Sequence, residues 1–146
     1  MRKTFVMRGS TAHGTTEVLN FGKYKQGYAY RLTEFTLYPS TNLLSQSIEV
    51  CGSITAGKTA LDPENPDFNN DGLIASALMK NDQAQNNAGY VQSVVDDTVV
   101  ITQNLLLLVK DTYSNPINWQ CRFESVKMSG PEEASVNYKQ FAISDE

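Results

Sequence analysis

Polar and apolar residues alternate along much of this chain, most clearly from 117 to 126, INWQCRFESV. Every second residue from Ile117 to Phe123 is apolar, and polar side chains occupy the positions between them. A period of two is typical of a strand that buries one face. Because Trp119 is in phase with Ile117 and Phe123, we expect it to be buried.

Other segments show the same kind of pattern. Residues 28–38, YAYRLTEFTLY, alternate with a change of phase between Leu32 and Phe35, which predicts a β-bulge. Residues 104–110, NLLLLVK, form a short apolar run beside turn residues, which favours a strand covered on both faces. The remaining predicted strands are 46–54, 4–7, 15–21, 91–95 and 97–102.

About eight short strands separated by turn residues predict an all-β protein, a single antiparallel β-sandwich with the jelly roll as one arrangement that fits. The chain has 146 residues, which is enough to bury one core. Since no repeat, linker or change of composition divides it, we expect one sandwich domain over residues 1–146.

At most one or two short helices are expected. In 71–80, DGLIASALMK, apolar residues recur at helical spacing behind Asp71, a potential capping residue, and this predicts a helix. In 129–143, Pro131 and the acids after it are typical of a helix start. Val136 and Tyr138 alternate, however, and a turn leading into a final strand fits residues 131–142 as well. Both interpretations of that segment stay open.

The composition suits strands and turns. Ser, Thr, Asn and Gln account for 44 residues, whereas hydrophobic residues make up 40% and charged residues 19%. No stretch approaches the roughly 20 apolar residues of a membrane helix, and residues 1–14 lack the apolar run of a signal peptide. We therefore expect no membrane contact and folding in a cytoplasm. In that compartment Cys51 and Cys121 are expected to be buried thiols.

The string from Gly52 to Thr59, GSITAGKT, matches the phosphate-loop pattern GxxxxGK[ST]. A working phosphate loop lies between a strand and a helix, whose N-terminus and backbone N–H groups hold the phosphates. The strand is predicted here, but Pro63 and Pro66 follow too soon for a helix. We therefore interpret the string as a strand that ends in a polar turn.

Asp67, Asn69 and Asp71 match the first half of an EF-hand calcium loop. The loop position that needs a bidentate glutamate is Leu78, so a true EF-hand is excluded. A looser calcium site at Asp67, Asn69 and Asp71 stays as one hypothesis. The other is a surface loop whose Asp and Asn side chains bind their own backbone, and this one is favoured. No other cofactor is expected.

Catalytic chemistry has little support. His13 is the only histidine, and it lies in a Gly- and Thr-rich stretch that makes a poor setting for a general base. Zinc needs more His or Cys ligands than the chain holds. The tyrosines at 24, 28, 30 and 38 are expected to pack in the core and across strands rather than stack on bases or sugars. We therefore expect a protein that is not an enzyme.

The net charge of −4 is unevenly distributed. Residues 1–31 carry +5, and the other 115 carry −9. Contact between the basic part and nucleic acid, or with the acidic face of a neighbouring subunit, is one interpretation. Since no dense basic run exists, solvated side chains are the favoured one.

Residues 115–142, NPINWQCRFESVKMSGPEEASVNYKQFA, combine an Asn-Pro turn, an alternating aromatic strand and a Ser-Gly-x-Glu-Ala turn. This stretch, with the opening FVMRGSTAHGTTEVLNF, resembles the small all-β, jelly-roll-like virion proteins of bacteriophages, namely capsid, decoration and head-accessory subunits. The resemblance implies a homo-oligomeric structural subunit that is folded in the host cytoplasm and located in the virion. Its partners would be copies of itself and other virion proteins.

The competing hypothesis is a carbohydrate- or surface-binding sandwich assisted by calcium in the loop 62–72. It requires exposed aromatic residues on one face of a sheet.

Overall fold

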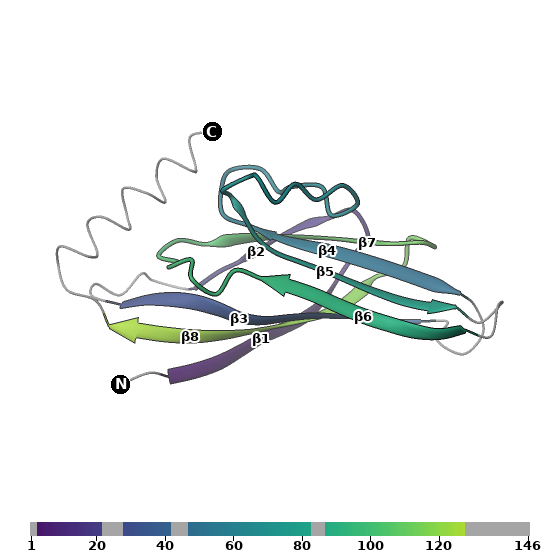
Figure 1. Ribbon diagram of the computed structural model, residues 1–146, viewed down its shortest axis with the longest axis horizontal. Helices are drawn as coiled ribbons and strands as arrows, with labels where there is room; N and C mark the ends of the chain where they lie inside the picture. The colour runs from purple at the N-terminus through teal and green to yellow at the C-terminus, as the bar shows by residue number, and fades with distance from the viewer. Residues whose placement is uncertain (1–2, 22–27, 42–46, 83–86, 128–146) are drawn as a thin grey trace.

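The computed structural model describes residues 3–21, 28–41, 47–82 and 87–127, and these residues form two layers of strands (Figure 1). The strands are β1 (Lys3–Thr11), β2 (Thr16–Leu19), β3 (Tyr28–Pro39), β4 (Ile48–Thr55), β5 (Leu73–Asp82), β6 (Asn87–Val95), β7 (Leu105–Asp111) and β8 (Ile117–Lys127). One sheet has the order β1-β8-β3 and the other the order β2-β7-β4-β5-β6. Every strand pair is antiparallel. The expected all-β antiparallel sandwich is confirmed.

Strand pairing is nested around the middle of the chain. β1 pairs with β8, β2 pairs with β7, and β4 pairs with β5. β6 extends the five-stranded sheet beyond β5 and forms its edge. Within the described ranges no helix is long and apolar enough to cross a bilayer.

The two sheets bury their facing side chains in one core. Phe35, Leu37 and Ile54 are almost completely buried there. Gly52 faces the same core, and a Cβ placed on it would come within 3.1 Å of the Leu37 Cδ1 atom. Gly52 therefore lets the sheets approach closely at this point, and packing accounts for a glycine that the phosphate-loop pattern also requires.

Trp119 of β8 is only 6% exposed, which confirms the burial expected from the alternation. Its Nε1–H donates a hydrogen bond to Thr11 Oγ1 at 2.8 Å, so the buried ring leaves its one polar group satisfied. Gly9 of β1 lies beside the ring, and a Cβ there would meet Cζ2 at 3.1 Å.

Tyr30 packs in a cluster with Phe5 and Phe21. Its ring is stacked on Phe21 at 5.0 Å between centroids and meets Phe5 edge-on at 5.6 Å. The expectation of core packing is thus confirmed for Tyr30. It is wrong for Tyr38, which is 56% exposed. The residue at 24 lies outside the described part.

The bulge predicted in 28–38 is present, because the pairing of β3 with β8 shifts between Leu32 and Glu34. Thr33 is the extra residue, and its Oγ1 donates to the Arg122 carbonyl oxygen at 3.2 Å.

The helix predicted at 71–80 is wrong, because this segment is β5, hydrogen-bonded to β4 on one side and β6 on the other. A register shift opposite Ile54 and Thr55 adds Ile74 as an extra residue, so Ile74 and Ala75 are both buried. The bulge at Ile74 interrupts the alternation of the strand, and the apolar residues of 71–80 therefore recur at a spacing that resembles that of a helix.

The strand predicted at 97–102 is also wrong. Asp96 Oδ1 accepts hydrogen bonds from the Thr98 backbone and hydroxyl, which makes a turn, and only Ile101 forms a bridge, with Tyr30. The segment 131–142, for which helix and strand were both considered, lies outside the described residues.

Candidate functional site

The string that matches a phosphate loop runs from β4 into a loop at residues 56–72, which Figure 1 shows standing above the five-stranded sheet. Ser53 Oγ donates to the Leu61 carbonyl oxygen at 2.7 Å, and the Leu61 N–H donates to Thr55 Oγ1 at 3.2 Å. These bonds hold the loop against the sheet. Residues 56–72 contain no helix, so the helix N-terminus that binds phosphate is missing at this position.

Asp67, Asn69 and Asp71 are exposed in the same loop. The Asn69 N–H donates to Asp67 Oδ1 at 3.0 Å, and the Gly72 N–H donates to Asn70 Oδ1 at 2.9 Å. These are Asx turns, in which a side chain binds the backbone two residues ahead. In the described ranges no group of three or more His, Cys, Asp or Glu residues is placed to hold a metal ion. A calcium site here stays a prediction.

Lys110 of β7 forms salt bridges with Asp62 and Glu64, two further acidic residues of this loop. Its Nζ lies 3.3 Å from Asp62 Oδ1 and 3.1 Å from Glu64 Oε1. The hydrogen bond from Asn65 is the main cause that lowers the pKa of Asp62, and the one to Glu64 is the main cause that raises the pKa of Lys110. Asp62 and Glu64 therefore already have a cationic partner, which competes with any metal ion for them.

A polar pocket of about 380 Å³ lies beside Lys110, and it brings together residues far apart in the sequence. It is lined by His13, Glu49, Cys51, Glu64, Lys110, Asp111, Thr112 and Ser114. The Asp111 backbone N–H donates to His13 Nδ1 at 2.9 Å, so the proton of the neutral ring is on Nε2. Sequence reasoning missed this placement of His13, because the contact spans 98 positions.

The pocket lacks an activated nucleophile. Burial is the main cause that raises the pKa of the Cys51 thiol to about 11, and Glu64 and Glu49 raise it further. A reactive cysteine needs the opposite, a lowered pKa beside positive charge. Since the hydrogen bond to His13 comes from a backbone amide, no nucleophile–base pair is formed by these groups.

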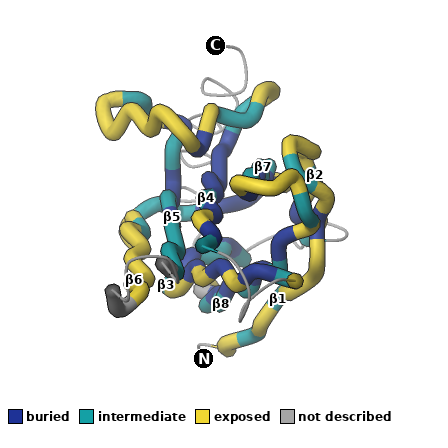
Figure 2. The backbone as a smooth tube through the Cα atoms, turned by 90° about the vertical axis from the view of Figure 1, so that its right-hand side faces the viewer, coloured by how far each residue is buried: buried dark blue, intermediate teal, exposed yellow. Residues whose placement is uncertain are grey.

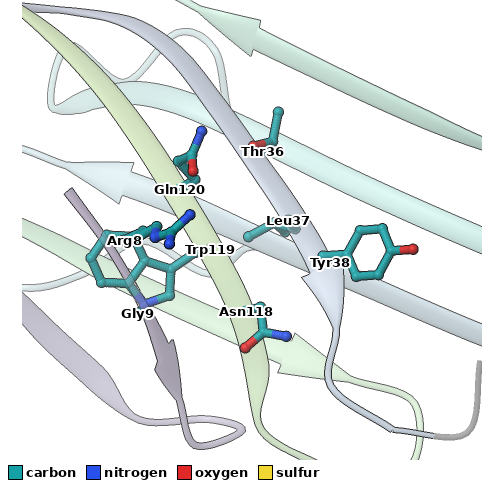
Figure 3. Close-up of a pocket in the computed structure, with 8 residues that line it drawn as sticks. All are labelled: Arg8, Gly9, Thr36, Leu37, Tyr38, Asn118, Trp119 and Gln120. Carbon is teal, nitrogen blue, oxygen red and sulfur yellow. The ribbon is translucent and has the colours of Figure 1, made fainter. Parts of the chain in front are cut away.

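A shallow groove of about 560 Å³ follows the outer side of the three-stranded sheet (Figure 3). Its lining residues are Arg8, Gly9, Thr36, Leu37, Tyr38, Asn118, Trp119 and Gln120. In Figure 3 Arg8 and Trp119 lie on one side of β8 and Tyr38 on the other. Because Trp119 is buried, Tyr38 is the aromatic residue of this groove that offers an exposed ring.

The basic residues of the first third that the structure describes lie in the three-stranded sheet. Lys3 and Arg8 are exposed on β1, and Arg31 is half-buried on β3, across from Glu124 of β8. The lysines at 23 and 25 lie outside the described residues.

The edge strand β6 carries several exposed apolar side chains, and Figure 2 shows this strand as a largely exposed segment at the side of the molecule. Tyr90, Val91 and Val94 are 52%, 57% and 46% exposed. Phe68, at 65%, projects from the loop 56–72 and lines a hollow of about 190 Å³ together with Val94. We call Phe68, Tyr90, Val91 and Val94 the β6 patch; Tyr90 and Val94 lie on one face of β6, and Val91 lies on the other.

Sequence reasoning did not identify the β6 patch. The available signal was the run YVQSVV at 90–95, which has no charged residue, together with a phenylalanine inside the polar loop. Comparison of the chain with models of known protein families and with curated proteins finds no match.

Proposed function

We propose that this protein is a non-enzymatic structural subunit that assembles through protein–protein contacts. The β6 patch carries the proposal, because exposed apolar side chains gathered at an unprotected sheet edge are typical of an interaction surface. Strand edges offer backbone donors and acceptors to a partner, and the neighbouring side chains add apolar contact.

The assembly we propose is a bacteriophage virion, with the protein as a capsid, decoration or head-accessory subunit. The resemblance of residues 115–142 and of the opening segment to such subunits supports this. Three of the four nested strand pairs of an eight-stranded jelly roll, β1–β8, β2–β7 and β4–β5, support this, although β6 pairs with β5 rather than with β3; viral capsid subunits and lectins use the jelly roll. Copies of the chain and other virion proteins would be the partners.

The test is light scattering behind size exclusion over a range of protein concentrations, run with calcium and again with a chelator. A defined oligomer or larger assembly that is unaffected by the chelator is expected. A monomer at every concentration contradicts the proposal. If the protein is a monomer, a thermal melt is added; a melting temperature that is higher with calcium than with the chelator favours the alternative below.

The second candidate is a carbohydrate-binding sandwich, and the groove favours it. Tyr38 offers an exposed ring, and the side chains of Arg8 and Gln120 offer hydrogen bonds, which together form the chemistry of a sugar site. Binding to a panel of immobilised glycans that is lost in Tyr38→Ala would support it. Glycan binding by the wild type should also be compared with and without calcium, since the loop of Asp67, Asn69 and Asp71 belongs to this hypothesis.

A further inference from the structure

Among the strands that the structure describes, four lie at sheet edges, and they differ in how they are protected. Natural edge strands avoid pairing with other chains through charge, proline or short length. β1 carries Lys3 and Arg8, and β3 carries Glu34 and ends in Pro39. β2 has only 4 residues, one of them Glu17. β6 has 9 residues, NAGYVQSVV, with no charge and no proline.

The free backbone groups of β6 follow from its pairing with β5. The Asp96 N–H donates to the Ile74 carbonyl oxygen at 2.9 Å, and Val95 lies opposite Ala75. In an antiparallel ladder this direction alternates, so Tyr90, Gln92 and Val94 turn their N–H and C=O groups toward β5. Val91 and Ser93 therefore direct theirs away from the sheet. Residues 89–94 are all exposed, so this edge is accessible.

We propose that β6 pairs antiparallel with β6 of a second copy, about a two-fold axis at Gln92, and joins the two five-stranded sheets into one. This inference rests on the proposed function, and it specifies the partner as a second copy of the chain and the register in which the two strands pair. Val91 then exchanges backbone hydrogen bonds with Ser93 of the partner subunit, and Gln92 lies opposite Gln92 of the partner subunit. The interface is isologous, so one patch serves both copies.

The side chains select this register. Centred on Gln92, each Tyr90 lies opposite Val94 of the partner subunit, and aromatic–β-branched pairs stabilise antiparallel strands. A shift that centres the pairing on Val91 or Ser93 would place Tyr90 or Val94 opposite the partner's Gln92 instead. The same pairing directs Asp96 and Asp97, which follow one β6, toward the end of the partner's sheet that carries the partner's Lys80. In each copy Lys80 pairs with Tyr90, so opposite charges approach each other across the interface.

Gln92 provides a charge test, because it lies opposite itself only in this pairing. Gln92→Lys alone and Gln92→Glu alone place like charges face to face, which should weaken the dimer by up to about fivefold. An equimolar mixture of the two variants should restore it. Val18 is the matched control, an exposed residue on β2 at the opposite edge of the same sheet, and Val18→Lys should leave association unchanged.

A crosslink tests the register. Opposite residues at a non-hydrogen-bonded position have Cα atoms about 4.5 Å apart, within the range that a disulfide spans. In a Cys51→Ser background, Gln92→Cys should form a disulfide-linked dimer under mild oxidation. Val94→Cys should not, since its two copies would lie four residues apart along the strand, about 13 Å.

The outcomes separate this inference from the proposed function. A dimer that both single charge variants weaken, that the mixture restores and that Gln92→Cys crosslinks supports the pairing. An oligomer unaffected by either charge at Gln92 overturns the pairing and leaves the structural-subunit proposal standing. A wild type that is monomeric at every concentration and gives no crosslink at Gln92→Cys overturns the pairing, and it also contradicts the self-assembly on which the proposed function rests.

Discussion

Replacing Trp119 with alanine should remove a large part of the stability of this protein. The side chain is 6% exposed, its ring lies against Gly9, and its Nε1–H bonds to Thr11. Truncating a buried tryptophan costs about 3–5 kcal/mol in the free energy of unfolding, through lost burial and the cavity left behind. The total stability of a domain is only about 5–15 kcal/mol. Trp119→Ala should therefore lose between about a fifth and all of the stability of the protein.

Urea unfolding followed by far-UV circular dichroism is the suitable assay, because Trp119 is the only tryptophan and its removal abolishes the tryptophan fluorescence. Trp119→Phe keeps most of the burial and loses the hydrogen bond, so its unfolding free energy should fall by about 1–2 kcal/mol. Tyr38→Ala is the matched control on the neighbouring strand β3. Since Tyr38 is exposed, the change should stay within about 0.5 kcal/mol. A Trp119→Ala variant within about 1 kcal/mol of the wild type would refute the reasoning.

Three further predictions concern Gly52 and Lys58 of the phosphate-loop string and the thiol of Cys51. Gly52→Ala should lower the unfolding free energy by about 1–3 kcal/mol in the same urea assay, because its Cβ would press on Leu37 in a packed core; unchanged or increased stability would show that the sheets have room there. Lys58→Ala should leave the melting temperature unchanged with or without ATP, whereas an ATP-dependent stabilisation lost in this variant would show that the string binds phosphate. Cys51, with its pKa raised to about 11, should be alkylated slowly at neutral pH and faster as the pH rises toward 11, as read by mass spectrometry; rapid labelling at pH 7 would contradict this. Since folding raises that pKa from 9.0, the contribution of the neutral thiol to stability is complete below pH 9 and is lost as the pH rises through about 11.

The sequence predicted the strands that bury one face. In β8 the core lies on one side only, so the period of two from Ile117 to Phe123 is directly visible, and the predicted range 117–126 differs from the observed one by a single residue. In β7 the apolar run predicted a strand covered on both faces, and in the described strand Leu105–Asp111 one face is buried and the other is half-buried.

The sequence failed at β5 because its environment is set by distant segments. Pairing with β4 introduces the bulge at Ile74, and the loop residue Phe68 contributes to a hollow beside Ser76 on the outer side of the sheet. Neither the bulge nor the contact with the loop can be recognised from the residues of β5 alone. The sequence of this segment shows only the helical spacing of apolar residues from Leu73 to Leu78.

The same limitation applies to the candidate sites. His13 meets Asp111 because β2 pairs with β7 and holds the preceding turn there, which no local pattern encodes. The run from Tyr90 to Val95 is visibly uncharged, but its position at an edge depends on the order of all five strands in the sheet.

The position of β8 between β1 and β3 has a consequence for folding during synthesis. β4, β5 and β6 follow one another along the chain and can pair as soon as they leave the ribosome. β1 and β3 lack their common neighbour until the residues up to Lys127 have been translated and have emerged. Because such long-range pairs form slowly, the three-stranded layer closes last. Until then the apolar side chains of β3 that the finished core buries are exposed in the nascent chain, and exposed apolar surface of this kind favours aggregation or chaperone binding.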